Sequence, residues 1–192
     1  MNAPIATRLT IAQFHAWLDS RHAALAYDES KWELFDGVPE MQASERWVHV
    51  RTKVTIMLAL RGAIARAGLP LEVGMDGLGV QIGSEEEYVP EVVVFPAGKI
   101  ADHDRIAPDP IVVVEVLSPS SLNKDLRIKA VGYARVPTIA HYLVVDPDTC
   151  ALLHFRRAGE AFLLPDKPLT EGVLRLDPPG LDVPIAEFFG MV

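Results

Sequence analysis

The stretch 111–117 is apolar at every position except Glu115, which stands near its carboxyl end. A strand that is apolar on both sides of its pleat is typical of a sheet with both faces covered. An ionised carboxylate buried there costs several kcal/mol unless a cation, a proton or a metal ion compensates it. The sequence therefore predicts a covered sheet in which another part of the chain supplies a partner for Glu115.

Length and composition indicate how large a fold surrounds this strand. The chain has 192 residues, of which 49% are hydrophobic and 23% are charged, a balance typical of a globular protein with a sizeable core. This length indicates one domain, residues 1–192. The single cysteine, Cys150, cannot form an internal disulfide, which favours a reducing compartment.

Targeting signals and charge narrow the class of protein. The first residues lack the basic start and apolar centre of a signal peptide, and no stretch approaches the roughly 18 apolar residues of a membrane span. We therefore expect a cytoplasmic protein without a membrane partner. The net charge of −8 argues against a surface that grips nucleic acid all over, so a nucleic-acid site would be focused or its acids partly neutralised by metal ions.

Hydrophobic periodicity and turn residues divide the chain into helices and strands. Helices are predicted over 11–21, 45–67, 121–135 and 185–189. A hairpin is predicted over 32–41, and further strands over 69–75, 77–82, 88–95, 111–117, 140–145, 151–156 and around Phe162. The apolar positions of the longest helix are Trp47, Val50, Val54, Met57, Leu58, Ile64 and Ala65. This order predicts a mixed sheet flanked by helices in one α/β or α+β domain.

The helix predicted after Glu115 carries a lysine on its inward face. Its inward positions recur at spacings of 4, 3, 4 and 3 residues and are Leu122, Leu126, Lys129, Tyr133 and Val136. Lys129 either extends its stem outward to solvent or directs its ammonium into a cleft beside Glu115. Asp125, one turn earlier, is either a partner of the helix dipole or an acid that orients Lys129.

Three further residues are candidates for a site. Glu91 follows Pro90 before an apolar run, so it is either an edge residue near solvent or a ligand at the start of a strand. Glu33 is either on the polar face of the hairpin or a supporting acid, and His49 is either a surface residue or a site residue. Acids at strand ends suit Mg²⁺ or Mn²⁺, and an inward lysine can assist a metal-activated water or the charge that develops on a phosphate.

These residues fall into blocks with a fixed order along the chain. The blocks are Trp32-Glu33-Leu-Phe-Asp36-Gly37, His49, Pro90-Glu91-Val-Val-Val, Val114-Glu115-Val-Leu-Ser-Pro-Ser120, Asp125-x-x-x-Lys129-x-x-x-Tyr133 and Tyr142-Leu-Val-Val-Asp146-Pro. In this order they resemble the Uma-type family of restriction endonucleases, within the PD-(D/E)XK nuclease superfamily. The blocks that run from Glu115 to Tyr133 are the most specific part of the resemblance.

The resemblance implies a restriction-endonuclease-like core over about residues 9–189, with a central mixed β-sheet between helices. It implies a metal-dependent endonuclease that hydrolyses DNA, in which Glu91 and Glu115 hold Mg²⁺ or Mn²⁺ and Glu33 is a supporting acid. Lys129 replaces the usual motif lysine, because the position two residues after Glu115 is Leu117. Supporting positions are matched by His49, Ser118, Asp125 and Tyr133.

One position departs from the family pattern, which has an aspartate where this chain has Glu91. Glutamate keeps the charge but adds a methylene, and both Mg²⁺ geometry and catalysis are sensitive to displacements of about 1 Å. The chain is therefore either an active endonuclease or a nuclease fold retained for interaction, as a homodimer or with another partner. The candidates for phosphate contact, which otherwise form a solvated helix face, are Arg46, Arg51, Lys53, Lys124 and Arg127.

Overall fold

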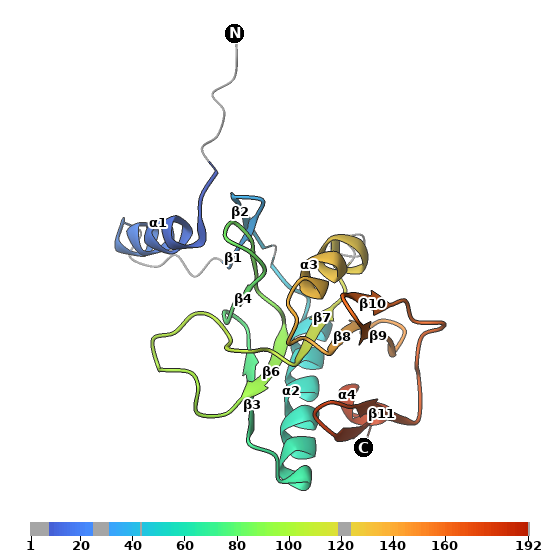
Figure 1. Cartoon of the computed structure of the whole chain (residues 1–192). Helices are drawn as coiled ribbons and strands as arrows, with labels where there is room; N and C mark the ends of the chain where they lie inside the picture. Colours follow the sequence, from blue (N-terminus) through green and yellow to red (C-terminus); the bar gives the residue numbers. More distant parts are fainter. Residues whose placement is uncertain (1–7, 25–30, 43, 119–123, 192) are drawn as a thin grey trace.

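The chain folds into two sheets and a terminal hairpin, with helices packed around them (Figure 1). The structure is a computed structural model that describes residues 8–24, 31–42, 44–118 and 124–191, without the side chains of 22–24, 124 and 125. None of the helices in these ranges has the length and apolar character needed to cross a bilayer.

The central sheet has six strands in the order β10-β9-β8-β7-β6-β3. Their bounds are β3 Leu71–Met75, β6 Val92–Pro96, β7 Val112–Val116, β8 His141–Asp146, β9 Ala151–Ala158 and β10 Ala161–Leu163. β7 and β8 run parallel while the other neighbours run antiparallel, so the predicted mixed sheet is confirmed. Every residue of β7 is buried, as the apolar run around Glu115 predicts.

A smaller sheet has the order β2-β1-β5-β4. Its strands are β1 Trp32–Phe35, β2 Val38–Met41, β4 Val80–Gln81 and β5 Glu87–Tyr88. The antiparallel pairing of β1 with β2 confirms the predicted hairpin. The single strand predicted over 88–95 is wrong, because β5 belongs to the smaller sheet and β6 to the central one.

The chain passes from one sheet to the other across Pro90. Val89 donates its backbone N–H to the Glu33 carboxylate of β1 at 2.9 Å, whereas Glu91 donates its N–H to the Val114 carbonyl of β7 at 3.1 Å. Pro90 has no N–H to give to either sheet, so it suits the point where the partner changes. The predicted Pro-Glu block therefore lies at the junction of the two sheets.

The helices are α1 Ile11–Ala24, α2 Trp47–Ala67, the π-helical η1 Lys124–Lys129, α3 Ala130–Ala134 and α4 Ile185–Phe188. α2 packs on the central sheet against β3, β6 and β7, and Gly68 closes its last turn at φ 63°. The hairpin of β11 (Val173–Leu176) and β12 (Leu181–Pro184) also packs against α2 through β12, and the sequence did not predict it.

Alternate residues of β7 enter two separate cores. Val112, Val114 and Val116 pack in the core that includes the inner side of α2. Val113 packs in the other core, with Tyr133 of α3. Because side chains alternate along a strand, Glu115 shares the face of Val113 and points toward α3.

The buried face of α2 differs from the predicted apolar stripe. Trp47, Val54 and Leu58 are exposed at 74%, 37% and 56%, and that part of the prediction is wrong. The buried face consists of His49, Thr52, Lys53, Ile56, Ala59, Leu60, Ala63 and Ile64. The helix is rotated away from its most apolar stripe because ion pairs of His49 and Lys53 hold this face against the end of the sheet.

Two contacts fix the helix that carries Lys129. A Cβ on Gly132 would lie 2.3 Å from the Tyr88 ring, so only glycine allows α3 to approach β5 this closely. The guanidinium of Arg157 on β9 donates to the carbonyls of Ala134 at 3.0 Å and Val136 at 2.7 Å, and to that of Ile139 at 2.5 Å. Arg157 therefore satisfies carbonyls that the end of α3 leaves unpaired.

Candidate functional site

The site lies at the edge of the central sheet where β7 ends and β6 begins. Val92 of β6 is paired with Val114 of β7, so the next residues outward are Glu91 and Glu115 on adjacent strands. The exposed fractions of these two residues are 9% and 3%. The strand order thus brings the two predicted metal ligands to the same edge, in surroundings where each carboxylate needs a partner.

The partner that the sequence predicts for Glu115 is present. Lys129 Nζ lies 2.8 Å from Glu115 Oε1 and 2.9 Å from Glu33 Oε1, and the lysine is 3% exposed. The Tyr133 hydroxyl donates to the same Glu115 oxygen at 2.8 Å. We call these four residues the Glu115 cluster, and they come from β1, β7, η1 and α3.

The Glu115 cluster favours an ionised carboxylate. Lys129 and Tyr133 are four residues apart, so both reach Glu115 from one side of their helix. Burial, followed by the charge of Glu115, raises the pKa of Tyr133 well above its usual value, which keeps its hydroxyl a hydrogen-bond donor. Lys129 is buried and paired with Glu115, so the alternative that its stem extends outward to solvent is wrong.

A second cluster surrounds Lys53 on the α2 side. Its ammonium lies 2.5 Å from Glu45 Oε2, 2.9 Å from Asp76 Oδ1 and 2.9 Å from Glu91 Oε2, and the residue is 2% exposed. Lys31, which is more exposed, pairs with Glu45 at 3.2 Å and with Asp76 at 2.7 Å. We call these five residues the Lys53 cluster.

The charges of the Lys53 cluster stabilise one another. Burial alone would lower the pKa of Lys53, but Glu91, Glu45 and Asp76 outweigh burial and raise it. Burial would likewise raise the pKa values of Glu45 and Asp76, and their lysine partners lower both below the usual range. Lys53, Glu45 and Asp76 are therefore charged near neutral pH.

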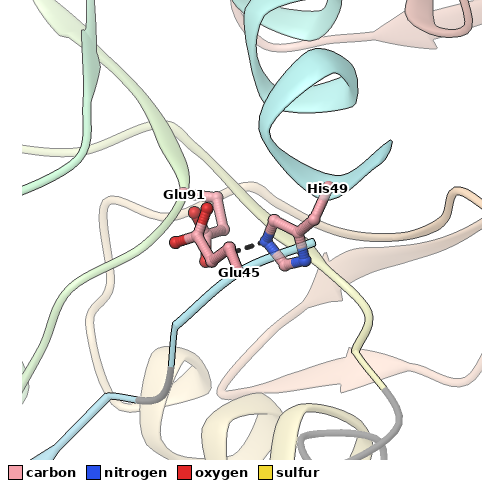
Figure 2. A group of neighbouring side chains, drawn as sticks. All are labelled: Glu45, His49 and Glu91. Atoms are coloured by element: carbon pink, nitrogen blue, oxygen red, sulfur yellow. Dashed lines mark ion pairs between the residues drawn. The ribbon is translucent and has the colours of Figure 1, made fainter. Parts of the chain in front are cut away.

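Two acids of this cluster and the neighbouring His49 form a group that could hold a metal ion (Figure 2). One ligand atom from each of Glu45, His49 and Glu91 lies within 4.8 Å of the others. His49 Nε2 is 3.3 Å from Glu91 Oε1, and Glu91 Oε2 forms an ion pair with Lys53. Among the described residues, neither this nitrogen nor Glu91 Oε2 has an aligned hydrogen bond, although both are buried. An imidazole with two carboxylates fits Mn²⁺ and similar divalent ions.

The structure divides the predicted site residues between two helices. Glu33, Glu115, Lys129 and Tyr133 meet on the α3 side, whereas His49 and Glu91 meet on the α2 side. Metal sharing by Glu91 and Glu115 stays a prediction. Ser118 is half-buried just after β7, and the side chain of Asp125 lies outside the described residues.

Sequence reasoning missed the roles of Lys53, Glu45 and Asp76. The available signal was the spacing of His49 and Lys53, which puts two polar residues one turn apart on a face continued by Ile56 and Leu60. Lys53 was a candidate for phosphate contact or for a solvated helix face. Because it is buried and paired with acids, the solvated alternative is wrong, and phosphate contact by Lys53 stays a prediction.

The other candidates for phosphate contact have different surroundings. Arg46 is half-exposed and pairs with Asp148 at 2.8 Å, next to the end of β8. Arg51 and Arg127 are exposed, and the side chain of Lys124 lies outside the described part of the chain. Phosphate binding by these residues remains a prediction.

Comparison with known proteins identifies a family and a related fold. The model of the Uma2 family, described as "Putative restriction endonuclease", matches residues 11–184. The solved structure of a "putative nuclease belonging to DUF820" from Anabaena variabilis superimposes with a TM-score of 0.68, over 95% of this chain and 98% of that chain. Its sequence identity of 16% supports the likeness of fold alone. No curated protein matches the chain.

Proposed function

Because the chain belongs to the Uma2 family, we propose that it is a metal-dependent endonuclease that hydrolyses DNA phosphodiester bonds. The observation that carries the proposal is the buried ammonium of Lys129, held between Glu33 and Glu115 at the end of β7. A lysine fixed beside two carboxylates at the edge of a sheet can act on a phosphate or a water that is bound there.

Carboxylates from adjacent strands are the proposed metal ligands. Glu91 and Glu115 would hold Mg²⁺ or Mn²⁺. Glu45 and His49, which lie near Glu91 on the α2 side, would add an oxygen and a nitrogen ligand. When bound, such an ion polarises the phosphate and lowers the pKa of a water. Glu91 is thus the residue that the two donor sets have in common.

The remaining residues of the Glu115 cluster position these groups. Tyr133 donates to Glu115 Oε1 at 2.8 Å and so holds this carboxylate in place. Glu33 accepts the Val89 N–H and receives the ammonium of Lys129, so it holds the lysine near the junction of the sheets. Lys129 would donate to the attacking water or to the charge that develops on the phosphate.

The proposal is tested by nicking of supercoiled plasmid with Mn²⁺. Glu115→Gln and Lys129→Met should each lower the rate about 100-fold or more, since each removes a charge from the reacting groups. Lys99→Met is the matched control, because Lys99 is exposed and pairs with Asp109 at the surface. Equal nicking by all four preparations would indicate contamination and would overturn the proposal.

A second candidate function is a binding module that has lost catalysis. The observation that favours it is the Glu91 carboxylate, which is one methylene longer than the family aspartate and already pairs with Lys53. If Mn²⁺ at millimolar concentration gives neither heat in calorimetry nor a rise in melting temperature, the module is favoured over the enzyme. A rise that Glu91→Gln abolishes would favour the enzyme.

A further inference from the structure

Lys53 occupies a place where a metal ion would otherwise find its ligands. Its ammonium lies 2.5 Å from Glu45 and 2.9 Å from Glu91, the two carboxylates of the candidate metal group. His49, the third member, precedes Lys53 by one turn on the same buried face of α2. The lysine and a bound ion would therefore share two acids within one small volume.

We propose that Lys53 is an internal cation that competes with divalent metal for Glu45 and Glu91 and so sets the metal affinity of the Glu45–His49–Glu91 group. This inference rests on the proposed function, because it concerns the ion that the nuclease would use. It assigns a regulatory role to a lysine outside the Glu115 cluster, where Lys129 acts.

Charge balance supports the competition. In the Lys53 cluster, the carboxylates of Glu45, Asp76 and Glu91 face the two ammonium groups of Lys31 and Lys53. These three carboxylates and two ammonium groups together carry one excess negative charge, and a bound divalent ion would make their sum positive. Without Lys53 the group would carry two negative charges, which a divalent ion neutralises. A buried group favours the neutral outcome, since excess charge is costly away from water.

The neighbouring imidazole also indicates a place prepared for a ligand. His49 is 5% exposed, and its Nε2 faces Glu91 at 3.3 Å without an aligned hydrogen bond. A buried imidazole nitrogen normally has a hydrogen-bond partner or a metal ion. The Lys53 ammonium pairs with the two acids, but among the described residues it makes no hydrogen bond to this nitrogen.

The experiment measures Mn²⁺ binding without DNA, by the electron paramagnetic resonance signal of the free ion. Lys53→Met should bind Mn²⁺ at least tenfold more tightly than the wild type, and Mn²⁺ should raise its melting temperature more. Lys99→Met is the matched control, because it removes an exposed lysine that pairs with Asp109 and belongs to neither cluster. Adding His49→Ala to Lys53→Met should abolish the gain.

Two outcomes would overturn the inference: no gain in Lys53→Met, or an equal gain in Lys99→Met. If Lys53→Met does not fold, Lys53→Gln takes its place, since its amide keeps donors for the acids while removing the charge. A gain in affinity without plasmid cleavage by any variant would sink the proposed function and leave this inference standing. Plasmid cleavage by the wild type without tighter Mn²⁺ binding by Lys53→Met would support the proposed function and overturn this inference.

Discussion

Glu115 Oε1 is the acceptor on which the buried polar contacts of the α3 side converge. It receives the Lys129 ammonium and the Tyr133 hydroxyl, each at 2.8 Å, inside a core of valines and aromatic rings. A buried ion pair gives little net stability, whereas loss of one partner leaves a costly charge. The hydroxyl of Tyr133 therefore matters mainly because it keeps the carboxylate satisfied.

This argument predicts the effect of Tyr133→Phe. The variant should lose about 2 kcal/mol of unfolding free energy, the order expected for a hydrogen bond to a buried charge. Tyr88→Phe is the control and should lose less, because its hydroxyl reaches Glu86 at only 3.4 Å. Urea denaturation measures both values, and equal losses would contradict the role given to Tyr133.

A histidine pair on β8 and β9 predicts how stability depends on pH. His141 Nε2 must donate to the Pro178 carbonyl, 2.8 Å away, because a carbonyl oxygen only accepts. When both rings are neutral, His141 Nδ1 therefore accepts from His154 Nε2, which is also 2.8 Å away. Burial, then His141 and Arg156, lower the pKa of His154 from 6.5 to about 3. Between pH 6.5 and about pH 3, His154 is therefore protonated in the unfolded chain but neutral in the folded chain.

Stability from His154 should thus be complete above its unfolded pKa and should fall as the pH drops below it. Between about pH 7.5 and about pH 5.5 the loss from this group should be about 1 kcal/mol. His154→Gln, which keeps a donor but does not titrate there, should show a correspondingly smaller loss across that interval. Thermal unfolding at both pH values measures the difference, and an unchanged slope would refute the assignment.

At the scale of elements, two helical glycines make opposite predictions. Gly132→Ala should destabilise the protein by about 1–3 kcal/mol, because its Cβ would overlap the Tyr88 ring and push α3 away. Gly62→Ala in α2 should stabilise it by up to about 1 kcal/mol, since the nearest atom is the mobile end of Arg66 at 3.3 Å and alanine favours helix. Chemical denaturation of both variants tests the pair, and a neutral Gly132→Ala would show that the helix has room.

The same elements show how far the sequence could lead. The burial of β7 and the inward direction of Lys129 follow from local periodicity, because an apolar run and a helical spacing are visible within a few residues. The rotation of α2 could not be predicted in this way. It depends on Asp76 and Glu91, which are distant in the sequence and meet Lys53 only once the sheet has formed. The division of the predicted strand at Pro90 likewise depends on partners in two different sheets.

At the scale of the whole molecule, the terminal hairpin completes the core on the α2 side. Six apolar side chains of the hairpin and α4 are at most 2% exposed, and they are Leu174, Leu176, Leu181, Val183, Ile185 and Phe188. Burying one such side chain contributes about 1.5–3 kcal/mol, and a domain has only about 5–15 kcal/mol of net stability. The hairpin and α4 are therefore needed for the fold that holds the site.

Truncation tests this requirement. A chain that ends after residue 170 should lose cooperative thermal unfolding and bind a dye specific for exposed apolar surface. A chain that ends after Phe189 should unfold like the wild type, because it keeps every buried residue of the hairpin and α4. Cooperative unfolding of the shorter chain would show that the core on the α2 side closes without them.

The Arg157 contacts have a consequence for the order in which a newly synthesised chain can assemble its site. All the site residues, from Glu33 to Tyr133, leave the ribosome before Arg157. The carbonyls at the end of α3 accept hydrogen bonds from the Arg157 guanidinium, so these bonds form only later. Until β9 has left the ribosome, the end of α3, the helix that follows Lys129, lacks the hydrogen bonds from Arg157. The nuclease fold is therefore completed late in translation, after its acidic residues have already been made.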